Sequence, residues 1–202
     1  MRRFQPITGL HFLLLPLIIA ATVGVATPVG AASTPLDTVL AALKKEEAAP
    51  LERVRLFTQI GSVSDLYYFD RLLPDRAHSM KNPQSGGTEA IVIGKTQWVR
   101  SDGNWTQSLA SGAVSKLLPP IADLLRQGLS ETTETADHAG GRLVEGKMTW
   151  NLGSPCDGKL GFHISKQGLP AFMEFVGTCA GKPAHFNQAY SFFGPLKIEA
   201  PQ

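Results

Sequence analysis

Histidine and cysteine are the side chains with which this sequence could most readily do chemistry, through acid–base catalysis, metal binding or a nucleophilic thiol. Beyond the N-terminal region the histidines are scattered, without HxxxH, HExxH or Cys–His spacing, and they are His78, His138, His163 and His185. The sequence also contains no GxSxG motif and no phosphate-binding glycine loop. It therefore predicts no catalytic residue, no metal site and no cofactor, and we expect the protein not to be an enzyme.

One pair of polar side chains could still meet. His163 and Glu174 lie on the two arms of a predicted hairpin and could face each other, which is typical of a solvated contact between strands. An enzyme whose residues converge from distant strands is the least favoured hypothesis, because nothing in the sequence points to one.

The two cysteines, Cys156 and Cys179, lie in a stretch that predicts a β-hairpin, residues 155–180. Gln167-Gly168 is a two-residue turn signal, and apolar and polar residues alternate on both sides of it. The resulting register puts three apolar pairs on one face, namely Ile164 with Ala171, Phe162 with Met173, and Leu160 with Phe175. The same register brings Cys156 opposite Cys179, so the sequence predicts a disulfide across the hairpin.

Two alternatives to this hairpin remain open. Gly168 could occupy the left-handed position of a three-residue loop with a bulge, which would shift the register by one residue. The two cysteines could instead be free, buried thiols.

The first 32 residues have the pattern of a cleaved signal peptide. Arg2 and Arg3 precede an apolar run at residues 12–21, and small residues follow at 29–32, which predicts cleavage after Ala31 or Ala32. An uncleaved anchor is the alternative, although the run is short for a membrane span. No cysteine near the cleavage site offers a lipid attachment point. We therefore expect a single domain at residues 33–202, in a bacterial periplasm, with no stable membrane anchor after cleavage.

The charge of the chain argues against a polyelectrolyte partner. The formal net charge of +2 comes entirely from Arg2 and Arg3, so the mature chain is neutral. Nucleic-acid binding would call for a basic face, and we expect no nucleic-acid partner.

The rest of the chain predicts an α+β domain. A helix begins at the Thr34-Pro35-Leu36-Asp37 cap with an apolar stripe, ends in a solvated run at residues 44–47, and closes at Pro50. A second helix fits residues 119–129. Seven to nine short strands joined by tight turns account for most of the remainder, which indicates an antiparallel sheet. They fall in the stretches 51–83, 88–107, 137–152, 155–180 and 185–198.

Three short phrases together resemble the LolA-like superfamily, which includes the periplasmic lipoprotein carrier, related mycobacterial lipoproteins and the RseB-type stress sensor. The first combines LPDR at residues 73–76, EAIVIG at 89–94 and WVR-DGNW at 98–105. The second is ISKQGLP at residues 164–170, and the third is YSFFG at 190–194 with IEAP at 198–201. The resemblance implies a curved antiparallel sheet, an incomplete β-barrel, with about two helices packed on its concave side. Glycines within strands, at Gly94, Gly146, Gly161 and Gly177, agree with a bent sheet.

The resemblance also implies a non-catalytic binding protein for a lipid or for the acyl chain of a lipoprotein. It carries over no functional residue, because no local motif matches the family's functional arginine. We expect the ligand-lining residues to be Ile91, Ile93, Phe162, Ile164, Met173 and Phe175. The same residues could form an ordinary dry core.

A sensor or adaptor that binds another envelope protein is the alternative function. Aromatic residues on the strands could serve such an interface, namely Tyr67, Tyr68, Trp98 and Trp105. The sequence contains no signal for the identity of the ligand, for transfer as opposed to sensing, or for the oligomeric state.

Overall fold

The computed structural model describes residues 33–110, 121–137, 140–151 and 153–201. The predicted signal peptide, residues 1–32, lies outside the described residues. Ser33–Gln202 form one compact unit.

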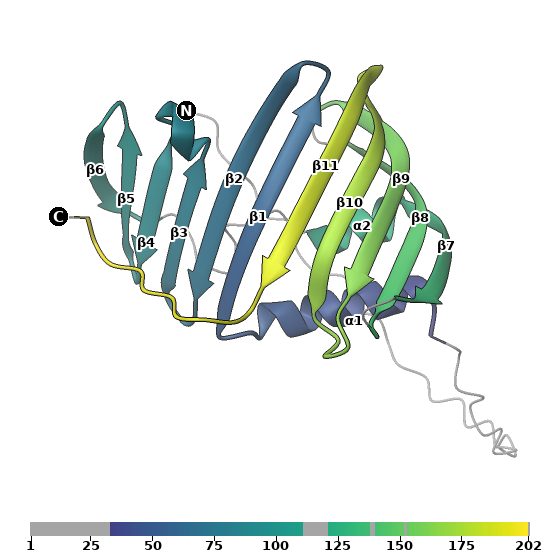
Figure 1. Ribbon diagram of the computed structural model, residues 1–202. Coiled ribbons are helices and arrows are strands. Elements are labelled where there is room, and N and C mark those ends of the chain that lie inside the picture. Colours follow the sequence, from purple (N-terminus) through teal and green to yellow (C-terminus); the bar gives the residue numbers. More distant parts are fainter. Residues whose placement is uncertain (1–32, 111–120, 138–139, 152, 202) are drawn as a thin grey trace, which may run out of the picture. The chain divides into compact units, whose positions relative to one another are not determined.

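The architecture is one antiparallel sheet of eleven strands, in the order β6-β5-β4-β3-β2-β1-β11-β10-β9-β8-β7 (Figure 1). The strands are β1 (Leu51–Ile60), β2 (Val63–Leu72), β3 (Arg76–Lys81), β4 (Glu89–Ile93), β5 (Thr96–Ser101), β6 (Asn104–Leu109), β7 (Leu129–Ala136), β8 (Arg142–Asn151), β9 (Pro155–Ile164), β10 (Pro170–Cys179) and β11 (Lys182–Ser191). β6 and β7 end the order without pairing to each other, so the curved sheet is an incomplete barrel. The predicted α+β class with an open antiparallel sheet is confirmed.

Two α-helices, α1 (Pro35–Glu47) and α2 (Ile121–Gly128), lie against one half of the sheet. Their contacts concentrate on β7, β8, β9 and β10 (Figure 1). The predicted capping box of α1 is present, because the Thr34 hydroxyl accepts from the Asp37 amide and the Asp37 carboxylate accepts from the Thr34 amide. None of the described helices has the length and apolar character that a membrane crossing needs.

The β9–β10 hairpin confirms most of the predicted register. Phe162 pairs with Met173, Leu160 with Phe175, and Cys156 with Cys179. The pair Ile164–Ala171 was wrong, because a bulge between Pro170 and Phe172 puts Pro170 opposite Ile164. The turn is also longer than two residues, since the Ser165 amide donates to the Leu169 carbonyl and Gly168 has the left-handed φ of +74°. The bulge absorbs the extra residue and restores the predicted register beyond it.

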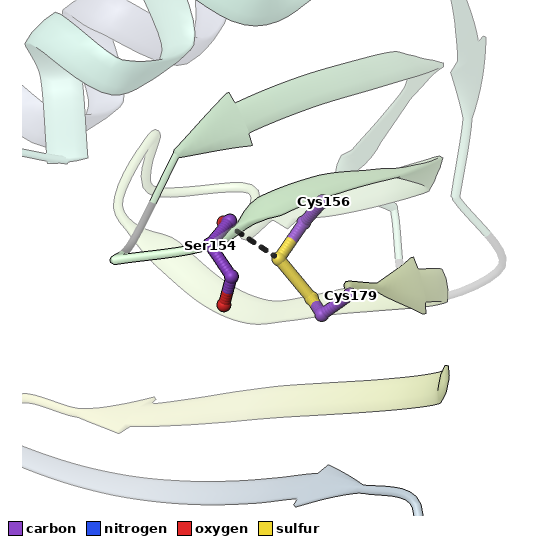
Figure 2. The surroundings of a disulfide bond; sticks show 3 residues. All are labelled: Ser154, Cys156 and Cys179. Carbon is purple, nitrogen blue, oxygen red and sulfur yellow. Dashed lines mark hydrogen bonds between the residues drawn. A yellow bond between two sulfur atoms is a disulfide. The ribbon is translucent and has the colours of Figure 1, made fainter. Parts of the chain in front are cut away.

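A disulfide joins Cys156 and Cys179, as predicted, and both cysteines are buried in the core (Figure 2). The carbonyl oxygen of Ser154 lies 3.7 Å from Cys156 Sγ. A disulfide sulfur has no proton to donate, so this is a van der Waals contact. The bridge fixes the end of the hairpin farthest from its turn.

Several boundaries differ from the predicted ones. β7 was not predicted, because its sequence LSETTETA is polar between Leu129 and Ala136, as suits an edge strand. β11 ends at Ser191, and the segment from Phe192 onward is not strand. Gly94 lies in the turn between β4 and β5 with φ of +58°, so it does not bend a strand.

Buried apolar side chains form two clusters of unequal size. The larger includes α1, α2 and strands β7 to β11, and Phe162, Ile164 and Phe175 are inaccessible to solvent within it. The smaller contains only Val54, Phe69, Ala77 and Val92, from β1 to β4. The two halves of the sheet are therefore packed very differently.

Candidate functional site

A cavity of about 560 Å³ opens on the helix side of the sheet, over strands β1 to β4. Its floor is the sheet, and one side is formed by residues of α1, α2, β8, β10 and β11. Its wall residues are mostly apolar. They are Glu46, Val54, Leu56, Thr58, Tyr67, Tyr68, Phe69, Ser79, Met80, Lys81, Thr88, Ala90, Ile121, Leu124, Trp150, Met173, Phe186 and Gln188.

Strand alternation explains most of this lining. On β1, Val54, Leu56 and Thr58 project to the same face, because successive side chains point to opposite sides of a sheet. Their pairing partners continue that face, since Val54 lies opposite Phe69 and Leu56 opposite Tyr67 on β2. The face continues through Ser79 of β3 to Ala90 of β4, and small side chains there leave space that large ones would fill.

The end of α1 brings a buried carboxyl to the cavity wall. Glu46 is 8% exposed, Glu52 at the start of β1 is 0% exposed, and Arg71 of β2 is 4% exposed. The Arg71 guanidinium lies 2.9 Å from the Glu52 carboxylate and donates a 2.7 Å hydrogen bond to the Glu46 backbone carbonyl. Arg71 therefore neutralises Glu52 and joins the end of α1 to the sheet through a backbone carbonyl.

Burial is the main reason that the pKa of Glu46 rises to about 10, and the hydrogen bond and charge of Glu52 add to the rise. The nearby Arg71 charge opposes this rise without overcoming it. Glu46 is therefore protonated at neutral pH, and the group Glu46–Glu52–Arg71 carries no net charge. Burial also raises the pKa of Tyr190, whose hydroxyl is enclosed beside the same carboxyl groups.

Among the described wall residues of the cavity, the indole Nε1 of Trp150 is enclosed and has no hydrogen-bond partner. The Glu46 carboxyl, by contrast, is hydrogen-bonded to Glu52. Trp150 is 7% exposed, and its ring packs against Phe175 and Phe186 at centroid distances of 5.0 and 5.9 Å. The ring position of Trp150 is therefore fixed by packing, while its N–H is left without an acceptor.

Another side of the cavity has a cation. The Lys81 ammonium lies 3.0 Å from the Asp65 carboxylate and 5.4 Å from the centre of the Tyr67 ring. Its hydrogen bond with Asp65 holds the pKa of Lys81 above its usual value. The Lys81 side chain is partly exposed, so this part of the wall is polar and solvated.

The six predicted lining residues fall into three groups. Met173 lines the cavity. Phe162, Ile164 and Phe175 lie in the larger core cluster on the same face of the sheet and are not part of the cavity wall. Ile91 and Ile93 belong to the opposite face of β4, because the wall residue Ala90 has the other parity.

The most informative residue that the sequence interpretation missed is Glu46. The run Lys44-Lys45-Glu46-Glu47 was expected to be solvated, but Glu46 is buried. A signal was available, because Val39, Ala42, Leu43 and Glu46 follow the i, i+3, i+4, i+7 spacing of one helix face.

The histidines that the structure describes pair with carboxylates on the opposite face of the sheet from the cavity. His78 contacts Glu89 at 2.7 Å, His163 contacts Asp137 at 3.1 Å, and His185 contacts Glu174 at 2.8 Å. The expected pair of His163 with Glu174 is therefore wrong. Within the described ranges no three His, Cys, Asp or Glu side chains come together in a way that could hold a metal ion.

The sequence matches no protein-family model, and no curated protein has a matching sequence. Among solved structures, the Mycobacterium tuberculosis lipoprotein LppX aligns with 82% of this chain and 98% of its own, at a TM-score of 0.57 and 15% sequence identity. The chain has the LolA-like fold.

Two further structures with the LolA-like fold align more weakly. MucB, solved in complex with MucA(peri), aligns with 81% of this chain and 58% of its own at a TM-score of 0.42 and 12% identity. A LolA superfamily protein from Nitrosomonas europaea aligns with 85% of this chain and 96% of its own, at a TM-score of 0.29 and 13% identity. We base the fold assignment on LppX, and at such identities the likeness concerns the fold alone.

Proposed function

We propose that this protein is a non-catalytic binding protein that holds the apolar chain of a lipid or of an acylated protein in the cavity over β1 to β4. The observation that carries the proposal is the cavity itself. Its volume of about 560 Å³ is within the range of small-molecule sites, and its wall is largely aliphatic and aromatic. Each methylene group moved from water into such a wall contributes about 0.8 kcal/mol to binding.

The arrangement of polar groups supports an amphiphile over a plain hydrocarbon. Lys81, Asp65 and Tyr67 form a solvated polar cluster on one side, while Leu56, Phe69 and Met173 supply apolar surface. A ligand with one polar end can leave that end near Lys81 and bury its chain among the apolar residues.

The environment that we propose is an oxidising one outside the cytoplasm. The Cys156–Cys179 disulfide supports this, because such bridges persist where thiols are not kept reduced. We accordingly propose that residues 1–32 direct export and are removed, and that residues 33–202 form the mature domain in a bacterial periplasm.

A cavity-filling variant tests the proposal. Ala90→Phe places a ring on the cavity face of β4, and Ala189→Phe places the same ring on the opposite face of the sheet, on β11. Binding is measured by displacement of an environment-sensitive fluorescent dye with 1-monolauroylglycerol. We expect Ala90→Phe to weaken binding at least tenfold while Ala189→Phe matches the wild type, with both variants melting like the wild type.

Two results would contradict the proposal. The first is a wild-type protein that binds neither the dye nor the monoacylglycerol, and capture of a stoichiometric envelope protein would then favour the sensor or adaptor. The second is unchanged binding in a folded Ala90→Phe variant, because the ligand would then lie elsewhere.

A further inference from the structure

Lys81 is the one described wall residue of the cavity that carries a full charge at neutral pH. The other acidic or basic side chain in that wall belongs to Glu46, which keeps its proton. Lys81 belongs to the cavity face because it pairs with Tyr67 of β2, which in turn pairs with Leu56 of β1. The row of side chains from β1 to β3 therefore runs from an aliphatic residue through an aromatic one to a cation.

Two contacts hold the Lys81 ammonium in place. It lies 3.0 Å from the Asp65 carboxylate and 5.4 Å from the centre of the Tyr67 ring, whose face attracts a cation. The Lys81 side chain is 44% exposed, so a ligand has access to it. The cavity thus has a positioned, accessible cation on one side.

Asp65 does not use up this cation. The Asp65 Oδ1 accepts a 2.6 Å hydrogen bond from the Asn82 amide, and its Oδ2 accepts from the Tyr67 hydroxyl at 3.3 Å. The bond from Asn82 lowers the pKa of Asp65 more than the bond from Lys81 does, so the carboxylate charge is shared among several donors. An ammonium has three N–H donors, and the contact with Asp65 occupies one of them. Lys81 therefore keeps donors for a second anionic oxygen.

We propose that Lys81 binds the anionic head group of the amphiphile, a carboxylate or a phosphate, while the apolar chain lies along the rest of the cavity wall. This inference rests on the proposed function and specifies the charge of its ligand.

Stability alone does not account for a lysine at this position. A partly exposed ion pair contributes little to the free energy of unfolding, and Asp65 already accepts hydrogen bonds from Asn82 and Tyr67. Asp65 is also not a wall residue of the cavity, and borders a separate groove with Asn82. A ligand in the cavity therefore meets the cation of this pair first.

A series of ligands with the same chain length and different head-group charge tests the inference. Laurate and dodecyl phosphate are anionic, 1-monolauroylglycerol is uncharged, and dodecyltrimethylammonium is cationic. Each is titrated calorimetrically into the wild type at neutral pH, below its micelle concentration. We expect the better anionic ligand to bind about fivefold more tightly than the monoacylglycerol, because it gains a charge-assisted hydrogen bond, and the cationic ligand to bind most weakly.

Salt and the two anionic heads sharpen the result. Raising sodium chloride from about 0.05 M to about 0.5 M should reduce the advantage of the anionic ligand and leave the monoacylglycerol unaffected, because salt screens partly exposed charges. The tighter of laurate and dodecyl phosphate identifies the source of the head group, a free fatty acid or a phosphorylated lipid.

Three variants locate the effect. Lys81→Gln should bind the anionic and the uncharged ligands within about twofold of each other, since the charge-assisted bond is lost. Asp65→Asn should increase the preference for the anion, because the Lys81 charge is no longer shared. Lys95→Gln, an exposed lysine in the turn between β4 and β5, removes the same charge outside the cavity wall and should match the wild type.

The outcomes separate this inference from the proposed function. Equal binding of anionic and uncharged ligands, a preference for the cationic ligand, or an anion preference that a folded Lys81→Gln variant keeps would overturn the role of Lys81 and leave the cavity as an apolar site. A wild-type protein that binds none of the ligands would overturn the proposed function and this inference with it. Thermal melting identifies a variant that fails to fold, and if Lys81→Gln fails, an unchanged anion preference in Asp65→Asn overturns the inference.

Discussion

The two halves of the sheet have the same antiparallel pairing, but their side chains pack differently. Around β7 to β10 the helices α1 and α2 cover the sheet, the disulfide fixes one hairpin, and Phe162 and Phe175 are fully buried. Over β1 to β4 the core is reduced to four buried residues, and a cavity lies above it. The first half is a closely packed support, and the second half offers apolar surface to a ligand.

The difference arises from side-chain size on one face of the strands. The supporting half presents Phe162, Met173 and Phe175, which fill the space under the helices. On the same face the cavity half presents the smaller side chains of Thr58, Ser79 and Ala90, which cannot fill it. Backbone pairing thus sets the curvature and the faces, while side-chain volume decides where the space is left.

The largest expected effect comes from truncating one side chain in each half. Phe162→Ala removes a fully buried ring and should lower the free energy of unfolding by about 3–5 kcal/mol. Leu56→Ala should cost about 1 kcal/mol, because Leu56 already borders the cavity and little new empty volume is created. Guanidinium chloride unfolding measures both, and equal losses would contradict the contrast between the halves.

Reducing the disulfide should weaken the supporting half. The bridge closes a loop with a sequence separation of 23 residues, and its loss should cost about 3 kcal/mol of stability. Thermal melting with and without reductant measures this, and the double variant Cys156→Ala/Cys179→Ala, which has no bridge to reduce, is the control. A melting temperature that reductant leaves unchanged in the wild type would count against a stabilising bridge.

A smaller effect, dependent on pH, is expected at the boundary between the halves. The folded protein keeps a proton on Glu46 up to about pH 10, whereas the unfolded chain releases it above about pH 4.5. The unfolded state therefore binds fewer protons in that window, so the Glu46 contribution makes the protein less stable as the pH rises from 4.5 towards 10. The slope from this group is at most about 1.4 kcal/mol per pH unit.

Glu46→Gln should remove that part of the pH dependence. Relative to the wild type, the variant should gain about 2 kcal/mol of stability between pH 6 and pH 8, measured by guanidinium chloride unfolding at each pH. Glu47→Gln, at the exposed neighbouring position, should follow the wild-type curve. Parallel curves for Glu46→Gln and the wild type would show that Glu46 is not held protonated.

The sequence was most informative where two independent patterns agreed. The apolar alternation and the two cysteines selected the same β9–β10 register, and the Thr34–Asp37 cap fixed the start of α1. The continuous apolar run of β4 had no alternation from which to choose a face, so Ile91 and Ile93 were expected at the ligand when their face is the opposite one. The cavity itself depends on which small side chains from β1, β3 and β4 become neighbours, and that follows only from the complete sheet order.

In the function that we propose, the cavity over β1 to β4 carries an amphiphile. Native mass spectrometry of the full chain, expressed with export in a bacterial host and followed by organic extraction, tests it most directly. We predict a mature mass with the disulfide intact and a bound lipid, which is lost when Ala90→Phe fills the cavity and is retained in Ala189→Phe. A bare mature mass, or equal lipid in both variants, would contradict the account.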